Sequence, residues 1–230
     1  MGKNHEKVQL IGSWVSPFVF RARVALNLKS VSYEFLEEKV GTKSDLLLKS
    51  NPVHKKIPVL IHHGKPICES LVIVQYIDEV FDGVKILPED PYDRAIHRFW
   101  AAYLDDKFFP ALKTIRMVQG EEVQKKLVEI KEGLALLDEA LVKLSKGKPF
   151  FGGDQLGYLD IALSGFVAWI QVREKTYDIK LIDESIIPNL AAWVDSLRAH
   201  PAVKDIIPTA DGLIEWVQVN LGPPPTPAAN

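Results

Sequence analysis

The sequence contains little cysteine and no long apolar run. Its 230 residues include a single cysteine, Cys68, which excludes an internal disulfide, a paired-cysteine redox motif and a cysteine-rich metal site. No segment approaches the ~20 consecutive apolar residues of a membrane-spanning helix. The amino-terminal stretch MGKNHEK lacks the apolar core of a secretory signal. We therefore expect a protein of the cytosol, with no membrane as a partner.

A surplus of charge of either sign is also missing. The 28 basic and 30 acidic residues give a formal net charge of −2, and no basic stripe is present for a phosphate backbone, so nucleic acid is not an expected partner. The six histidines are scattered. His62 and His63 are adjacent on a predicted strand, where successive side chains face opposite ways, so we expect no metal site. Small molecules become the expected partners.

The first part of the chain, residues 6–86, alternates strand and helix patterns. The predicted order is β-α-β-α-β-β-α, with Ser44 as the cap of the second helix and a hairpin that turns near Gly64. This order indicates a compact α/β domain with a mixed sheet. The elements are expected at residues 8–13, 17–29, 31–38, 44–51, 57–69 and 70–81.

Strand patterns disappear after a segment that contains Pro88 and Pro91. We interpret residues 87–92 as a linker. Beyond it, helical periodicity predicts an all-helical domain over residues 93–221. The proline-rich tail, residues 222–230, is not expected to pack. The helical segments are expected at residues 93–119, 121–145, 159–176 and 188–199.

The pair Ser16-Pro17 stands between the first predicted strand and the first predicted helix. Serine is a favoured N-cap and proline fits the first helical turn, so a plain helix start explains the pair. A helix N-terminus also attracts anions, and a hydroxyl there can donate a hydrogen bond to a bound sulfur anion. The two interpretations are compatible.

Ile57-Pro58 opens a predicted strand. Proline lacks a ladder donor and restricts the preceding residue to an extended conformation. The backbone of Ile57 is then available to pair with a short peptide, although a simple edge strand is the alternative. Lys43, Lys55 and Lys56 flank the second helix and either meet a carboxylate or are only solvated.

Glu69-Ser70 begins the third predicted helix. Ser70 is expected as its N-cap, with free amide donors behind it, and Glu69 is placed to meet an ammonium group. The pair then suits an α-amino-acid head group, while helix capping alone is the alternative interpretation.

These features occur together and in order, and they resemble the cytosolic glutathione transferases. The segments SPF (16–18), NPVHKKIPVLIHHGKPICES (51–70) and FFGGDQLGYLDIAL (150–163) resemble the plant tau class, over nearly the whole chain short of the tail. The resemblance implies an α/β thioredoxin-like N-terminal domain with a cis-proline before its third strand, then an all-α C-terminal domain. It also implies a homodimer that uses glutathione as co-substrate, without a metal, in detoxification and the stress response.

The resemblance assigns roles to individual residues. Ser16 becomes the catalytic serine that hydrogen-bonds the glutathione sulfur, and Asp160 becomes a structural residue that starts a buried helix. A cysteine at position 16 supports thiol exchange, whereas serine can only stabilise the thiolate of glutathione itself. The glutathione-binding residues are then Lys43 and Lys56 for the glycyl carboxylate, Ile57 for the cysteinyl backbone, and Glu69 and Ser70 for the γ-glutamyl end.

A pocket for the electrophilic acceptor is expected between the two domains. Arg116 belongs to this pocket and stands where related tau sequences often carry a tryptophan, which indicates anionic acceptors. Two alternatives to conjugation of hydrophobic electrophiles stay open: glutathione-dependent reduction of hydroperoxides, and a non-catalytic carrier of metabolites or glutathione conjugates. The other predicted pocket residues are Trp14, Phe18, Phe109, Trp169 and Trp216.

Overall fold

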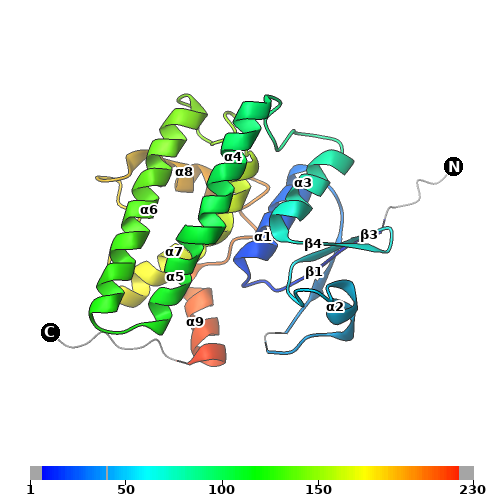
Figure 1. Ribbon diagram of the computed structural model, residues 1–230, viewed down its shortest axis with the longest axis horizontal. Helices are drawn as coiled ribbons and strands as arrows, with labels where there is room; N and C mark the ends of the chain where they lie inside the picture. The colour runs from blue at the N-terminus through cyan, green and yellow to red at the C-terminus, as the bar shows by residue number, and fades with distance from the viewer. Residues whose placement is uncertain (1–6, 40, 223–230) are drawn as a thin grey trace. The chain divides into compact units, whose positions relative to one another are not determined.

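The computed structural model describes residues 7–39 and 41–222 (Figure 1). The amino-terminal residues up to residue 6 and the tail from residue 223, on which the sequence allowed predictions, lie outside the described residues. The chain divides into two compact units, which meet in sequence at Ile86 and Leu87. Each unit is described by itself.

The first unit contains a four-stranded mixed sheet in the order β2-β1-β3-β4. β1 runs parallel to β2 and antiparallel to β3, which pairs antiparallel with β4. Helices α1 and α3 pack against each other. The predicted order of strands and helices is confirmed, and the elements are β1 (Val8–Gly12), α1 (Pro17–Leu28), β2 (Glu34–Glu37), α2 (Asp45–Ser50), β3 (Val59–His62), β4 (Lys65–Cys68) and α3 (Ser70–Val80).

The turn between β3 and β4 corrects one expectation about the histidines. His62 ends β3, but His63 and Gly64 have φ values of 51° and 74°, as a two-residue turn with left-handed residues requires. The strand alternation therefore stops at His62, and the two imidazole rings stack with centroids 4.1 Å apart. The prediction that they face opposite ways is wrong, because His63 belongs to the turn.

The second unit is helical throughout its regular elements (Figure 1). The predicted segments 121–145 and 188–199 match α6 and α8, and α7 is one residue longer at each end than predicted. The helices are α4 (Pro91–Tyr103), a π-helix (Leu104–Phe108), α5 (Phe109–Thr114), a short 3₁₀ helix (Ile115–Met117), α6 (Glu121–Ser145), α7 (Tyr158–Tyr177), α8 (Pro188–Ala199) and α9 (Ala210–Leu221).

Two predicted boundaries in this unit differ from the structure. Helix α4 begins at Pro91, inside the predicted linker, because the Asp90 carboxylate accepts hydrogen bonds from the backbone N–H groups of Tyr92 and Asp93. The predicted helix 93–119 is also interrupted by the π-helix. Pro110 follows this interruption, and a proline cannot donate the regular helical hydrogen bond.

Asp160 organises the start of α7. Its buried carboxylate accepts hydrogen bonds from the backbone N–H groups of Phe151, Gly152 and Gly157 and from the indole of Trp193. Burial raises the pKa of Asp160 to about 6, although each of these hydrogen bonds lowers it. All four partners belong to the protein itself, which agrees with the structural role expected for this residue.

Candidate active site

The predicted glutathione-binding segments leave the same end of the sheet in the first unit. Ile11 of β1 lies opposite Val59 at the start of β3, and Val59 lies opposite Cys68 at the end of β4. Because these neighbours are antiparallel, the segments after β1, before β3 and after β4 emerge together. These three segments carry Ser16, Ile57 and the pair Glu69-Ser70, respectively.

Ser16 is the N-cap of α1, as predicted. Its backbone is extended (φ −80°, ψ 119°), Pro17 occupies the first helical position, and its half-buried side chain accepts a hydrogen bond from the Val19 N–H. The N···O distance of 3.4 Å is long for a protein hydrogen bond. Among the described residues, the Ser16 hydroxyl donates to no protein group. Its proton therefore remains available to a ligand at the helix N-terminus.

The bond between Ile57 and Pro58 is cis, which confirms the expected cis-proline before the third strand. In the described part of the chain, no hydrogen bond uses the backbone N–H or C=O of Ile57. The preceding loop is held by buried Asn51, a residue that the sequence reasoning missed. The Asn51 side chain accepts from the His54 N–H at 3.0 Å and donates to the Lys56 C=O at 2.9 Å. Asn-Pro marks a turn in sequence, so Asn51-Pro52 was an available signal.

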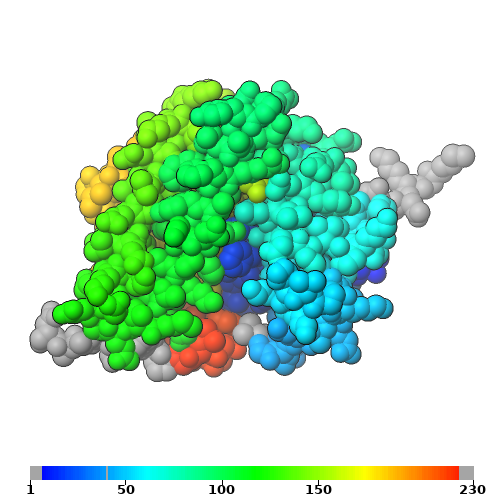
Figure 2. Space-filling model, in the orientation of Figure 1, coloured from blue at the N-terminus to red at the C-terminus, as the bar shows by residue number. Residues whose placement is uncertain are grey.

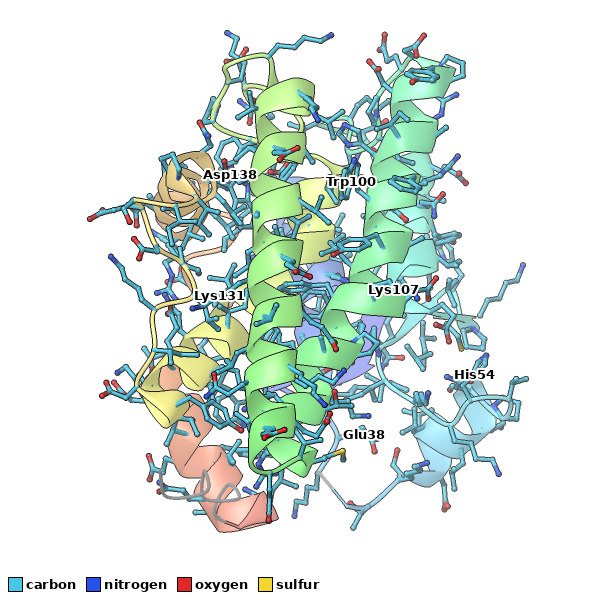
Figure 3. All side chains as sticks on the ribbon, turned by 60° about the vertical axis from the view of Figure 1, so that its left-hand side comes forward. Glu38, His54, Trp100, Lys107, Lys131 and Asp138 are labelled. Atoms are coloured by element: carbon cyan, nitrogen blue, oxygen red, sulfur yellow. The ribbon has the colours of Figure 1, made fainter. Side chains whose placement is uncertain are left out.

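A basic pocket of about 220 Å³ lies between the end of β2, α2 and the loop before β3. It brings together the predicted residues Lys43, Lys56 and Ile57, together with Lys55. It also contains Glu38, labelled in Figure 3, which accepts hydrogen bonds from the backbone and hydroxyl of Ser44. With Lys39, the pocket has four lysines and a single carboxylate, that of Glu38. Its net charge is therefore positive, which suits a carboxylate ligand. Its lining is completed by Ser13, Lys39, Thr42 and Leu47.

The start of α3 corrects the predicted cap. The N-cap is Glu69, with φ 70° and no side-chain capping hydrogen bond, and Ser70 is the first helical residue. Ser70 is buried, and its hydroxyl accepts a hydrogen bond from Arg21 Nη1 at 3.1 Å. Serine caps only when it precedes the helix, and here the left-handed backbone of Glu69 moves the boundary by one residue. Glu69 itself is exposed, with its Oε1 3.7 Å from Nε2 of His54.

Cys68, next to this pair, is not an activated nucleophile. Burial raises the pKa of its thiol, and the neighbouring Glu69 carboxylate raises it further. The thiol lies 3.6 Å from the Ser50 C=O, to which it donates. A reactive thiolate at this end of the sheet must therefore come from a bound ligand.

The predicted acceptor residues fall in both units. In the first unit, Trp14 is exposed, and Phe18 lies against the guanidinium group of Arg21.

In the second unit, Phe109 stacks on Phe166 with ring centroids 5.2 Å apart. The ring centre of Trp169 lies 5.8 Å from the guanidinium carbon of Arg173. Arg116 lines a pocket of the second unit together with Arg173, and Trp216 is half-buried on α9.

The described residues contain neither a candidate metal site nor a membrane-spanning helix. Within residues 7–39 and 41–222, no three His, Cys, Asp or Glu side chains gather in a group that could hold a metal ion. Over the same described ranges, no helix has the length and apolar character needed to cross a membrane.

Comparisons with known proteins identify the family of the chain. The profile of the glutathione S-transferase N-terminal domain matches residues 6–79, and that of the C-terminal domain matches residues 120–196. Glutathione S-transferase U17 of Arabidopsis thaliana is 54% identical over 214 residues, which cover 92% of this chain and 94% of that protein.

Two solved structures extend the comparison. A tau class glutathione S-transferase from mango, Mangifera indica, superimposes with a TM-score of 0.90 at 59% identity, covering 93% of this chain and 98% of that one. Rice GST1, solved in complex with glutathione, gives a TM-score of 0.86 at 37% identity and covers 94% and 97% of the two chains. With its thioredoxin-like first unit and helical second unit, the chain belongs to the tau class of the glutathione S-transferases, enzymes that use glutathione as co-substrate.

Proposed function

We propose that this enzyme transfers glutathione to hydrophobic electrophiles, and that Ser16 stabilises the glutathione thiolate. The observation that carries the proposal is the Ser16 hydroxyl, which stands at the N-terminus of α1 with an unused proton. The positive end of the helix dipole and a donated hydrogen bond both favour a thiolate over a thiol. Detoxification of such electrophiles in the plant cytosol is the role that we assign to this chemistry.

The proposed reaction forms one bond to sulfur and breaks one bond in the acceptor. A free thiol with a pKa of about 8.5 is only slightly ionised at neutral pH. Because one unit of pKa corresponds to about 1.4 kcal/mol, even one hydrogen bond from Ser16 to the sulfur changes the thiolate population severalfold. The thiolate then attacks the electrophilic carbon, and the displaced group leaves with the electron pair of its bond.

The remaining glutathione contacts are proposed from the positions of the residues in the first unit. Lys43 and Lys56 line the basic pocket and receive the glycyl carboxylate. Ile57 offers an unpaired backbone edge for the cysteinyl unit, as in strand addition. Glu69 and Ser70 bind the γ-glutamyl end, where the exposed Glu69 carboxylate meets its ammonium group.

The test is Ser16→Ala, assayed for conjugation from pH 6.5 to 9.5. A hydrogen bond to a charged group contributes about 1.5–3 kcal/mol, so the rate at pH 7 should fall by roughly 10- to 100-fold. Part of the loss should be recovered as the pH rises through the ordinary thiol pKa of about 8.5. Asp90→Ala, which removes the cap of α4, is the matched control for the loss of a helix cap.

Three results would decide the proposal. A folded Ser16→Ala protein with full activity at pH 7 would show that Ser16 is only a cap. Equal losses in Ser16→Ala and Asp90→Ala would assign the effect to stability. Because hydroperoxide reduction requires the same thiolate, Ser16→Ala should reduce it in parallel, and a loss of conjugation alone would contradict the proposed role of Ser16.

We also propose that the enzyme is a homodimer. Tyr92 and Phe99, seven residues apart on α4, are 72% and 61% exposed. A spacing of seven places both rings on one face of the helix, and α4 lies at the surface of the second unit (Figure 2). Large exposed aromatic side chains on one helix face are typical of a protein interface, and the mass in solution tests the assignment.

A further inference from the structure

A second pocket, of about 220 Å³, lies entirely within the helical unit and is called the arginine pocket below. It is formed by α7, α9 and the 3₁₀ helix that carries Arg116. Helices α7 and α9 contact each other (Figure 1). The lining residues are Arg116, Val172, Arg173, Lys175, Thr176, Ile214, Val217 and Gln218.

Arg173 is a buried cation in this pocket. Its side chain is 6% exposed, its Nε donates to the Leu112 C=O at 3.2 Å, and its guanidinium carbon lies 5.8 Å from the centre of the Trp169 ring. Burial lowers the pKa of Arg173 to about 10, and the positive charge of Arg116 contributes to this shift. At neutral pH the side chain is nevertheless charged.

Arg116 brings a second guanidinium group to the same pocket. Its Nη2 donates to the C=O groups of Leu221 and Gly222 at 3.1 and 2.6 Å, where the carbonyl end of the α9 dipole favours a cation. The Nε of Arg116 is buried and has no hydrogen-bond acceptor among the described residues. A donor left in this way carries a desolvation cost that a bound acceptor would remove.

Neither guanidinium group is neutralised by the residues around it. Across the described ranges, no carboxylate forms an ion pair with Arg116 or Arg173. Lys175, the third cation of the pocket, is paired with Asp211 at 2.6 and 2.8 Å. Tyr177, whose pKa is raised by burial, is a neutral phenol that donates to the Ile115 C=O. Among the described residues, the pocket therefore has two positive charges without a carboxylate partner, beside apolar side chains.

We propose that the arginine pocket binds the carboxylate of a small amphipathic organic acid, with Arg116 and Arg173 as its donors. Planar guanidinium groups match the geometry of a carboxylate better than an ammonium does. Val172, Ile214 and Val217 contact the apolar part of the ligand. The volume is below the ~300–1,000 Å³ of pockets for drug-sized ligands, so the ligand is a small acid or the acidic end of a larger molecule.

The test measures binding to the full chain without glutathione, so that its outcome is independent of Ser16. The probes are 3-phenylpropionate and its uncharged amide, compared by titration calorimetry at pH 7.5. Wild type should bind the acid at least tenfold more tightly than the amide. Arg173→Gln and Arg116→Gln should each reduce this preference at least fivefold. Arg116→Gln is included because Arg116 is half-buried, so its replacement should destabilise the fold less than replacement of the buried Arg173.

Arg94→Gln is the matched control. Arg94 also donates to backbone carbonyls, those of Pro88 and Glu89, but it does not line the pocket. It should keep the preference of wild type for the acid. Equal binding of acid and amide by wild type, or an unchanged preference in a folded Arg116→Gln protein, would overturn the proposal.

Discussion

The buried ion pair between Lys29 and Asp78 allows a sharp test of what holds the first unit together. Lys29 Nζ lies 2.8 Å from Asp78 Oδ1, and the two side chains are 0% and 7% exposed. Lys29 is the C-cap of α1, and Asp78 lies in α3. The same Asp78 oxygen accepts a hydrogen bond from the Ile86 N–H at 2.9 Å. The pair therefore connects both helices to the segment that ends the unit.

Lys29→Met should strongly destabilise the protein. Methionine fills a similar volume but removes the ammonium group that lies 2.8 Å from the buried Asp78 carboxylate, and breaking a buried pair in this way costs about 3–5 kcal/mol. For a chain of this size, 1 kcal/mol corresponds to roughly 2–4 °C in Tm. We therefore expect Tm to fall by about 6–20 °C.

The double variant Lys29→Met/Asp78→Asn separates charge from packing. It removes both charges, while the asparagine oxygen can still accept from the Ile86 N–H. Because a buried pair contributes little net stability against neutral residues of similar size, we expect most of the loss to be recovered. The control is Lys126→Met, which breaks the partly exposed contact between Lys126 and Glu129 at 2.7 Å. Pairs near the surface contribute about 0–1 kcal/mol.

The assay is urea unfolding followed by tryptophan fluorescence, with thermal denaturation as a second measure. The reasoning predicts a large loss for Lys29→Met, recovery in the double variant and a small effect for Lys126→Met. Similar losses for Lys29→Met and Lys126→Met would show that burial does not decide the effect. A double variant as unstable as Lys29→Met would show that the loss does not come from the Asp78 charge.

Two further variants test the proposed function. Glu69→Gln should weaken glutathione binding by roughly 10- to 100-fold, because the ligand ammonium loses a charged hydrogen-bond partner; an unchanged dissociation constant in titration calorimetry would remove Glu69 from the site. Phe99→Asp, which places a charge on the exposed face of α4, should shift the protein from dimer to monomer in sedimentation velocity, and a wild type that sediments as a monomer would contradict the dimer.

The strands and helices of the first unit were predictable because their signals are local, whereas the cis-proline was expected only from the resemblance to the family. Hydrophobic alternation, the Ser44 cap and the Ile57-Pro58 pair each determine the conformation of a few neighbouring residues. The cap of α3 was predicted one residue too late, because the left-handed φ of Glu69 has no signature in its residue type. Likewise, the contact between Ser70 and Arg21 joins residues 49 positions apart and cannot be found from spacing.

In the helical unit, the sequence predicted some helices closely and missed others. Helix α6 was predicted to the residue, since its amphipathic pattern is long and regular, whereas α9 lies beyond the four predicted segments despite a Thr209 cap. Arg173 also escaped notice. Because Glu174 and Lys175 follow it directly in the sequence, it resembles a surface arginine, and only the packing of α7 with α9 and the 3₁₀ helix reveals that it is buried beside Arg116.

The two ends of α1 carry groups with different roles, the proposed thiolate-stabilising serine at one end and a buried ion pair at the other. Its 12 residues span about 18 Å, with Ser16 at one end and the Lys29–Asp78 pair at the other. In a well-capped helix, the serine oxygen accepts a hydrogen bond of ordinary length. The long hydrogen bond from the Val19 N–H to Ser16 stabilises the helix less. Because the buried face of α1 and its contact with α3 hold the helix in place, a weak cap is tolerated. The hydroxyl is then available for the proposed hydrogen bond to a bound sulfur, at little cost to the stability of the fold.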